Sequence, residues 1–163
     1  MTRITVITRG SVLLLLTAAF LFSAGSAALA QYTVTSLVTT SGDPNLINAW
    51  GMAYASGGPF WISDEATGKS TVYDASGSIV PLVVTIPAAT TGATGSPSGI
   101  VANSTSGFVV TQNGVSGASS FIFAALDGTI SGWSPSVNAT SAVIAVNNHP
   151  TANYTGQIGR AHV

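Results

Sequence analysis

The chain has 163 residues, 18 of them glycine and none cysteine, and only 6% of its residues are charged. Ample valine, isoleucine and aromatic residues at such low charge are typical of a folded β-protein and exclude a disordered one, because apolar burial offsets the entropy lost on folding. The net charge is −1 and Lys69 is the only basic residue within 31–156, which excludes nucleic acid as a partner because no positive surface neutralises phosphates.

Residues 1–30 have the pattern of an export signal. Two arginines give a positive start, a run of apolar residues follows, and the segment ends in A-L-A. Small residues at Ala28 and Ala30 are the usual cleavage signature, so we predict a signal-peptide helix that is removed before Gln31. The protein is then secreted, periplasmic or in the cell envelope, with no membrane partner after cleavage. An uncleaved anchor helix is the alternative, because the uncharged run at 11–30 is just long enough to span a bilayer.

The next segments predict strands separated by turns. Residues 31–38 alternate apolar and polar side chains, which indicates a strand flanking the first repeat. That repeat, at 46–86, contains three or four short strands. The run F-W-I at 60–62 is typical of a strand buried on both faces. The sequence D-A-S-G at 74–77 predicts a tight turn, because Asp supplies a side-chain hydrogen bond and Gly a positive φ.

The first repeat recurs about 48 residues later, at 98–133. A repeat of roughly 40–50 residues with four strands is the signature of a β-propeller blade. A further strand at 142–146 predicts the start of a third blade, at 142–156. The aligned pairs are Gly51 with Gly99, Phe60 with Phe108, Ser63 with Thr111, Val72 and Tyr73 with Ile122 and Phe123, and Gly77 with Gly128.

These motifs resemble the NHL repeat, namely F-W-I-S-D at 60–64 and S-T-V-Y-D-x-x-G at 70–77. The longer segments D-P-N-L-I-N-A-W-G-M-A, F-I-F-A-x-L-D-G-T-I-S-G-W and V-I-A-V-N-N resemble an uncharacterised family of secreted bacterial proteins with NHL-like β-propeller repeats. The resemblance covers residues 32 to about 156 and implies fold and export, but no defined activity. We therefore predict an all-β fold, an incomplete β-propeller of about two four-stranded blades plus flanking strands.

Residues 157–163 do not continue the apolar strand that the resemblance implies after Gly156. The sequence Q-I-G-R-A-H-V can be encoded by codons that match a widely used sequencing adaptor, so we predict a non-native read-through tail. A natural terminus is the alternative, and resequencing the source locus across codon 157 decides between them. A closed ring of about six blades needs roughly 300 residues, so we expect the chain to be an N-terminal fragment.

The sequence has no recognised catalytic motif. It lacks G-x-S-x-G, H-E-x-x-H, a P-loop, G-x-G-x-x-G, a calcium-loop spacing and any cysteine nucleophile. His149 is the only histidine outside the tail, and we interpret it as a surface loop residue because no placed carboxylate completes a dyad. No catalytic or cofactor-binding residue is therefore predicted.

Asp64 and Glu65 form the most notable acidic pair. Neighbours on a strand point to opposite faces, so the two carboxylates cannot share a proton. We predict that Asp64 accepts hydrogen bonds from backbone amides at the strand end and starts the following turn. The alternative is a metal or ligand site at the mouth of the ring, formed by Asp64, Asn48 and Asp43 with Asn45 nearby. Such oxygen ligands suit Ca²⁺ or Mg²⁺.

The tryptophans and the glycosylation sequons each have two interpretations. We predict core packing for Trp50, Trp61 and Trp133, and a carbohydrate-stacking set is the alternative. Sequons for N-glycosylation begin at Asn103, Asn138 and Asn153. In a chain rich in Ser, Thr and Asn, with a resemblance to bacterial proteins, we assign them no role.

Two classes of function follow. The first is an exported propeller that is not an enzyme and serves as a binding or scaffold module. Its partners are a protein, a glycan or a cell-envelope component, besides the missing blades of its own full-length chain. The second is a metal-dependent propeller hydrolase, lactonase or lyase whose other ligands lie in the missing blades. Fold alone does not separate them. Axis-facing Glu, Asp or His on at least three blades would favour the enzyme.

Overall fold

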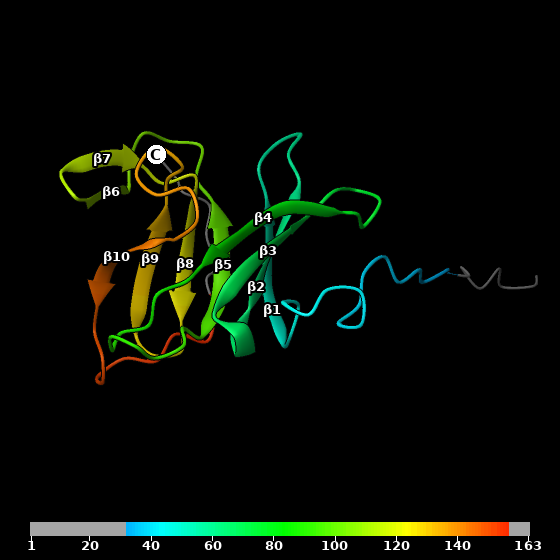
Figure 1. The fold of residues 1–163 in the computed structure, drawn as a ribbon, viewed down its shortest axis with the longest axis horizontal. Coiled ribbons are helices and arrows are strands. Elements are labelled where there is room, and N and C mark those ends of the chain that lie inside the picture. The colour runs from blue at the N-terminus through cyan, green and yellow to red at the C-terminus, as the bar shows by residue number, and fades with distance from the viewer. Residues whose placement is uncertain (1–31, 157–163) are drawn as a thin grey trace, which may run out of the picture. The chain divides into compact units, whose positions relative to one another are not determined.

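The computed structural model describes residues 32–156 (Figure 1). The predicted signal-peptide helix at 1–30, with Ala28 and Ala30, and the predicted tail at 157–163 lie outside the described residues. Every strand lies in one compact unit that begins at residue 36, and the description below concerns that unit. No helix among residues 32–156 has the length and apolar character needed to cross a membrane.

The described residues are all-β, with three antiparallel sheets, none of which closes on itself. The first sheet has the order β1-β2-β3-β4, and the second has the order β10-β9-β8-β5. A short 3-10 helix, η1 (Glu65–Thr67), joins β2 to β3. The strands of the first sheet are β1 (Ala49–Tyr54), β2 (Phe60–Asp64), β3 (Lys69–Tyr73) and β4 (Ile79–Thr85). Those of the second are β5 (Pro97–Ala102), β8 (Phe121–Ala125), β9 (Thr129–Trp133) and β10 (Val143–Asn147). The third sheet is a hairpin of β6 (Val109–Gln112) and β7 (Val115–Ala118).

The first sheet occupies the predicted first repeat, and its turns follow from local chemistry. Gly68 ends η1 with a φ of 63°, and Gly77 between β3 and β4 has a φ of 84°. Glycine adopts such angles without a steric cost. In the second turn the Asp74 carboxylate accepts hydrogen bonds from the amides of Ser76 and Ser78, at 2.8 and 2.9 Å. The turn predicted at 74–77 is therefore confirmed.

The predicted alignment of the second repeat is correct at Gly99 and wrong after it. β1 and β5 are the first strands of their sheets, and Met52 pairs with Ile62 as Ile100 pairs with Phe123, so Gly51 and Gly99 hold equivalent positions. Phe108, however, does not begin the second strand of the sheet. It precedes the separate β6–β7 hairpin, and the strand that pairs with β5 is β8. The V-V-T-Q run of β6 has the same short alternating pattern as a blade strand. For this reason the sequence alignment wrongly paired Phe108 with Phe60 and Thr111 with Ser63.

The turn glycines fix the corrected register. Gly68 and Gly128 both have a positive φ at the turn between the second and third strands of their sheets, so they correspond to each other. Counting from these turns along the observed strand pairs gives the remaining correspondences. The corrected pairs are Phe60 with Phe121, Trp61 with Ile122, Ile62 with Phe123, Ser63 with Ala124, Thr71 with Ser131, Val72 with Gly132 and Tyr73 with Trp133.

The second sheet also extends further than predicted. β10 pairs antiparallel with β9, so the strand expected to start a third blade at 142–156 is instead the fourth strand of the second sheet. The segment between the two strands, which contains Ser134 and Pro135, is a loop within this sheet. The loop returns beside the first sheet, where the amide of Thr85 donates to the carbonyl of Thr140 at 2.9 Å.

The strand predicted at 31–38 is not formed over its described part, 32–38. No neighbouring strand pairs with this segment, and alternation alone does not hold an extended chain in a sheet. Leu37 instead lies over the β3–β4 turn, with its carbonyl oxygen 2.6 Å from where a Cβ on Gly77 would be.

The core lies between the first and second sheets and contains two of the three tryptophans. Trp61 is 4% exposed and stacks on Phe121 with ring centroids 4.3 Å apart, and Trp133 lies 4.7 Å away. Core packing is thus confirmed for Trp61 and Trp133. It is wrong for Trp50, which is 46% exposed on the edge strand β1, where the register shifts next to it.

Candidate functional site

The candidate site lies on the outer face of the first sheet, the face turned away from the core. Because side chains alternate along a strand, Ile62 on β2 and its partner Thr71 on β3 lie on this face, whereas Trp61 points into the core. Residues 36–48, here named the strap, lead into β1 and contact this outer face. The strap brings polar and apolar groups onto the sheet from outside the repeat.

Asp43 anchors the strap to the sheet. It is 2% exposed, and its carboxylate accepts hydrogen bonds from the Tyr73 hydroxyl at 2.9 Å and from the Asn45 amide at 2.8 Å. Burial raises the pKa of Tyr73 to about 12, so the hydroxyl stays protonated and donates. The Lys69 ammonium donates to the side-chain oxygen of Asn45 at 2.6 Å. The strap is therefore held to β3 by two side-chain hydrogen bonds, from Tyr73 and from Lys69, between residues far apart in the sequence.

Asp64 is fully buried on the same face. Its Oδ2 accepts from the Thr71 amide at 3.0 Å and from the Thr71 hydroxyl at 2.8 Å, whereas its Oδ1 has no hydrogen-bond partner among residues 32–156. The side chain does accept a bond from a backbone amide, but the donor is Thr71 on β3 and not an amide at the end of β2. It makes no capping bond to the following turn, so this part of the prediction is wrong. Burial raises the pKa of Asp64 to about 7 despite the two bonds from Thr71, and the nearby charge of Asp43 raises it further.

The three metal-ligand candidates do not converge. Asp43 accepts a bond from Tyr73 and Asp64 accepts one from Thr71, both on β3, whereas the Asn48 side-chain amide donates to Glu65 at 2.8 Å. Both oxygens of Asp43 already accept hydrogen bonds. Within the described part of the chain, no three His, Asp or Glu side chains are grouped closely enough to hold a metal ion. Of the four carboxylate oxygens of Asp43 and Asp64, only Asp64 Oδ1 accepts no hydrogen bond from residues 32–156.

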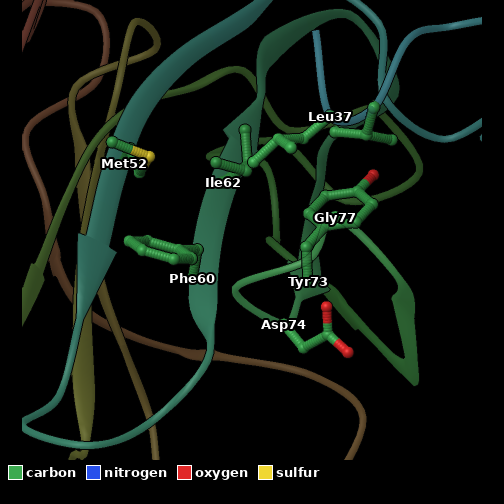
Figure 2. A pocket seen from close by; sticks show the side chains of 8 residues that line it. Leu37, Met52, Phe60, Ile62, Tyr73, Asp74 and Gly77 are labelled. Carbon is green, nitrogen blue, oxygen red and sulfur yellow. The ribbon is translucent and has the colours of Figure 1, made fainter. Parts of the chain in front are cut away.

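An apolar pocket of about 270 Å³ lies beside this network, between the strap and the sheet (Figure 2). β1 and β2 supply its wall with Met52, Phe60 and Ile62, and the strap adds Leu37. We did not predict this pocket from the sequence. The alternation of Met52 with its neighbours marks an apolar strand face, but nothing local shows that the strap crosses it. The remaining lining residues are Val38, Tyr73, Asp74 and Gly77.

Replacing Gly77 by Ala is expected to displace the strap. The residue has a φ of 84°, and an added Cβ would be 2.6 Å from the Leu37 carbonyl oxygen. Gly92 is a matched control, because its φ is 83° and nothing lies within 4 Å of an added Cβ. Gly92→Ala should cost only the backbone strain, about 1–2 kcal/mol of unfolding free energy. Gly77→Ala should cost roughly 1–3 kcal/mol more, as overpacking does, when urea unfolding is followed by circular dichroism. Equal losses in the two variants would contradict the contact.

The other sequence candidates have structural roles. His149 is exposed, and its Nδ1 lies 3.2 Å from the carbonyl of Asp127, as expected of a loop residue. Trp61 and Trp133 are buried, so the three tryptophans do not form a carbohydrate-stacking set. Of the sequon residues, Asn103 donates its side-chain amide to the carbonyls of Gly107 and Ser119, at 3.1 and 2.9 Å.

Comparison of the chain with protein-family models, with curated proteins and with solved structures found no match. The NHL-like propeller family implied by the sequence motifs therefore stays a prediction. What the outer face can do follows from its own geometry, namely a buried carboxylate with a raised pKa beside an apolar pocket that a polar strap partly closes.

Proposed function

We propose that the chain is part of an exported β-propeller that acts as a non-catalytic binding or scaffold module. One observation carries the proposal, the way in which the two four-stranded sheets pack. The Trp61 side of the first sheet contacts the Phe121 and Trp133 side of the second. By the corrected register, that side of the second sheet corresponds to the Phe60 and Tyr73 side of the first.

The two sheets therefore pack back to front and not as mirror images. Because each such contact joins the back of one sheet to the front of the next, further sheets can add one after another in the same direction. The row of sheets then either closes into a ring or stays open. Closure of four to eight such sheets around an axis is the arrangement of a propeller. A following sheet would pack on the face of the second sheet that carries Ile122 and Gly132. The β6–β7 hairpin lies near Gly132 at one end of this face, so the following sheet would pack beside the hairpin.

The outer face of the first sheet presents an apolar pocket closed on one side by a hydrogen-bonded strap, a place for a further sheet of the ring. Loops on a rigid scaffold commonly carry binding residues, so the external partner would bind the loops at the ends of the ring. The proposed partner is a protein, a glycan or a cell-envelope component. The predicted signal peptide would take the module to it.

The complete gene product tests the proposal. We expect the source locus to encode four or so further repeats in place of residues 157–163, giving a protein of roughly 300 residues. Its radius of gyration by small-angle scattering should be about 19 Å, that of a single compact domain. The exported protein should begin at Gln31 by mass spectrometry. A locus that ends where this chain does, or an elongated full-length product, would overturn the proposal.

A second candidate is a metal-dependent propeller hydrolase, lactonase or lyase. Asp64 Oδ1 favours it, because this buried carboxylate oxygen has no partner in the described residues and is a hard ligand suited to Ca²⁺ or Mg²⁺. Since the other carboxylate oxygens nearby are occupied, the remaining ligands would come from elsewhere in the complete protein. One divalent ion per complete chain by elemental analysis, lost in Asp64→Asn, would favour the enzyme over the scaffold.

A further inference from the structure

The apolar pocket on the first sheet occupies the same place in its repeat as a site that is filled in the second sheet. Its aromatic residues Phe60 and Tyr73 form a cross-strand pair, and so do Phe121 and Trp133, which correspond to them. In the second sheet this pair receives the side chain of Trp61 from the first. The chain thus contains one filled and one open example of the same site.

The filled example shows what the site accepts. The Trp61 indole stacks on Phe121 with an interplanar angle of 25° and a centroid distance of 4.3 Å, and lies against Trp133 at 4.7 Å. Offset stacking at such distances stabilises aromatic pairs beyond the burial of their area. The Phe121 and Trp133 pair of the second sheet therefore binds a flat, bulky aromatic ring.

The open example has the size and chemistry for the same group. Its volume of about 270 Å³ lies below the roughly 300–1,000 Å³ of pockets for drug-sized ligands, which suits a single ring system. The Tyr73 hydroxyl is bonded to Asp43, so its phenyl ring remains to contact a ligand. Met52 and Ile62 supply the thioether and aliphatic wall (Figure 2).

We infer that this pocket is a receptor for an indole side chain presented by another sheet of the same repeat, at the position that Trp61 holds in the first sheet. The inference rests on the proposed function, because it takes further sheets of this kind to exist. A second copy of this chain does not supply the group. The Trp61 side chain of a second copy would be buried in its own core. Ile122, at the corresponding position of the second sheet, is not an indole and is also buried, and Val110 of the β6–β7 hairpin lies on the same face of that sheet.

The test uses 3-methylindole, which is the tryptophan side chain without its backbone, and the full chain labelled at its methionine and isoleucine methyl groups. Saturable NMR shifts are expected at Met52 and Ile62, with a dissociation constant on the order of 1 mM, as for a small fragment. Phe60→Leu should weaken binding by about two- to tenfold through loss of the aromatic partner. Phe108→Leu is the matched control, the same change outside the pocket, and should leave binding unchanged.

Absence of saturable shifts at Met52 and Ile62, or equal weakening by Phe60→Leu and Phe108→Leu, would overturn the inference. The outcome is separable from that of the proposed function. If the complete gene product is not a propeller but 3-methylindole still binds, the pocket accepts an indole ring, but the inferred occupant is wrong together with the proposed function. If the product is a propeller but 3-methylindole does not bind, the receptor alone is wrong.

Discussion

Replacing Trp61 by Ala is expected to cause the largest loss of stability of any single change to this chain. The side chain is 4% exposed, and it joins the two sheets by stacking on Phe121 and packing on Trp133. Deleting a buried tryptophan removes its transfer free energy and leaves a cavity, which together cost about 3–5 kcal/mol. Since small domains have only about 5–15 kcal/mol of stability in total, a large share of the unfolding free energy should be lost and the transition should move to much lower urea.

Two variants make this prediction specific. Trp50→Ala removes the same side chain from an edge strand where it is 46% exposed, and should change the unfolding free energy by less than about 1 kcal/mol. Trp61→Phe keeps a ring on Phe121 and should recover part of the loss. Urea unfolding followed by far-ultraviolet circular dichroism measures all three. Comparable losses for Trp50→Ala and Trp61→Ala would mean that the indole does not hold the sheets together.

The second large effect is a fall in stability as the pH rises, caused by Asp64. Its ordinary pKa is 3.8 and burial raises the pKa to about 7 in the folded protein. The folded state therefore binds this proton more tightly than the unfolded state does. The resulting stabilisation is complete below about pH 4 and is lost as the pH rises through about 7. A difference of this size corresponds to the order of 4 kcal/mol.

Asp64→Asn should abolish this fall, because asparagine keeps an oxygen for the Thr71 donors and has no charge to bury. Unfolding free energies of both proteins between pH 4 and pH 8 measure the effect. Asp74→Asn is the control, since hydrogen bonds from Ser76 and Ser78 lower the pKa of this exposed carboxyl, so its contribution is lost as the pH falls. A wild-type profile that is flat from pH 4 to pH 8 would show that Asp64 is ionised without cost.

Features specified by neighbouring residues were predictable from the sequence. The turn at 74–77 depends on an Asp side chain and a glycine within four residues, and the F-W-I run of β2 is bulky enough to require burial. The turn was confirmed, and burial was confirmed at Trp61. Burial on both faces was wrong, because Phe60 and Ile62 on the other face are half-buried and line the pocket. The all-β character followed from the same local signals, because alternation and turn chemistry recur along the whole described chain. Closure of the sheets into a propeller remains a prediction, since it depends on sheets beyond the two described.

Features that depend on distant partners were not predictable. The β6 run has the same pattern as a blade strand, and only its pairing with β7 distinguishes it, so Phe108 was misplaced opposite Phe60. β10 belongs to the second sheet because β9 pairs with it, which no local signal shows.

The candidate site was missed in part for the same reason. The bond between Asp43 and Tyr73 joins residues 30 positions apart, and Leu37 comes to the pocket from the strap. The bond from Thr71 to Asp64 crosses the whole β2–β3 turn. Asp64 was predicted to accept backbone hydrogen bonds at its own strand end, whereas its backbone donor is on the neighbouring strand β3. Its complete burial, which raises its pKa, had no sequence signal.

The hydrogen bonds of Asn103 lead us to expect that the choice of production host affects the folding of the β6–β7 insertion. Its side-chain nitrogen fastens both ends of the β6–β7 insertion, and that nitrogen is the atom to which an oligosaccharide is attached during passage through a eukaryotic secretory pathway. A sugar added there before folding would keep the insertion from closing. Bacterial production, which usually leaves such sequons unmodified, is therefore the route on which this part of the chain can fold.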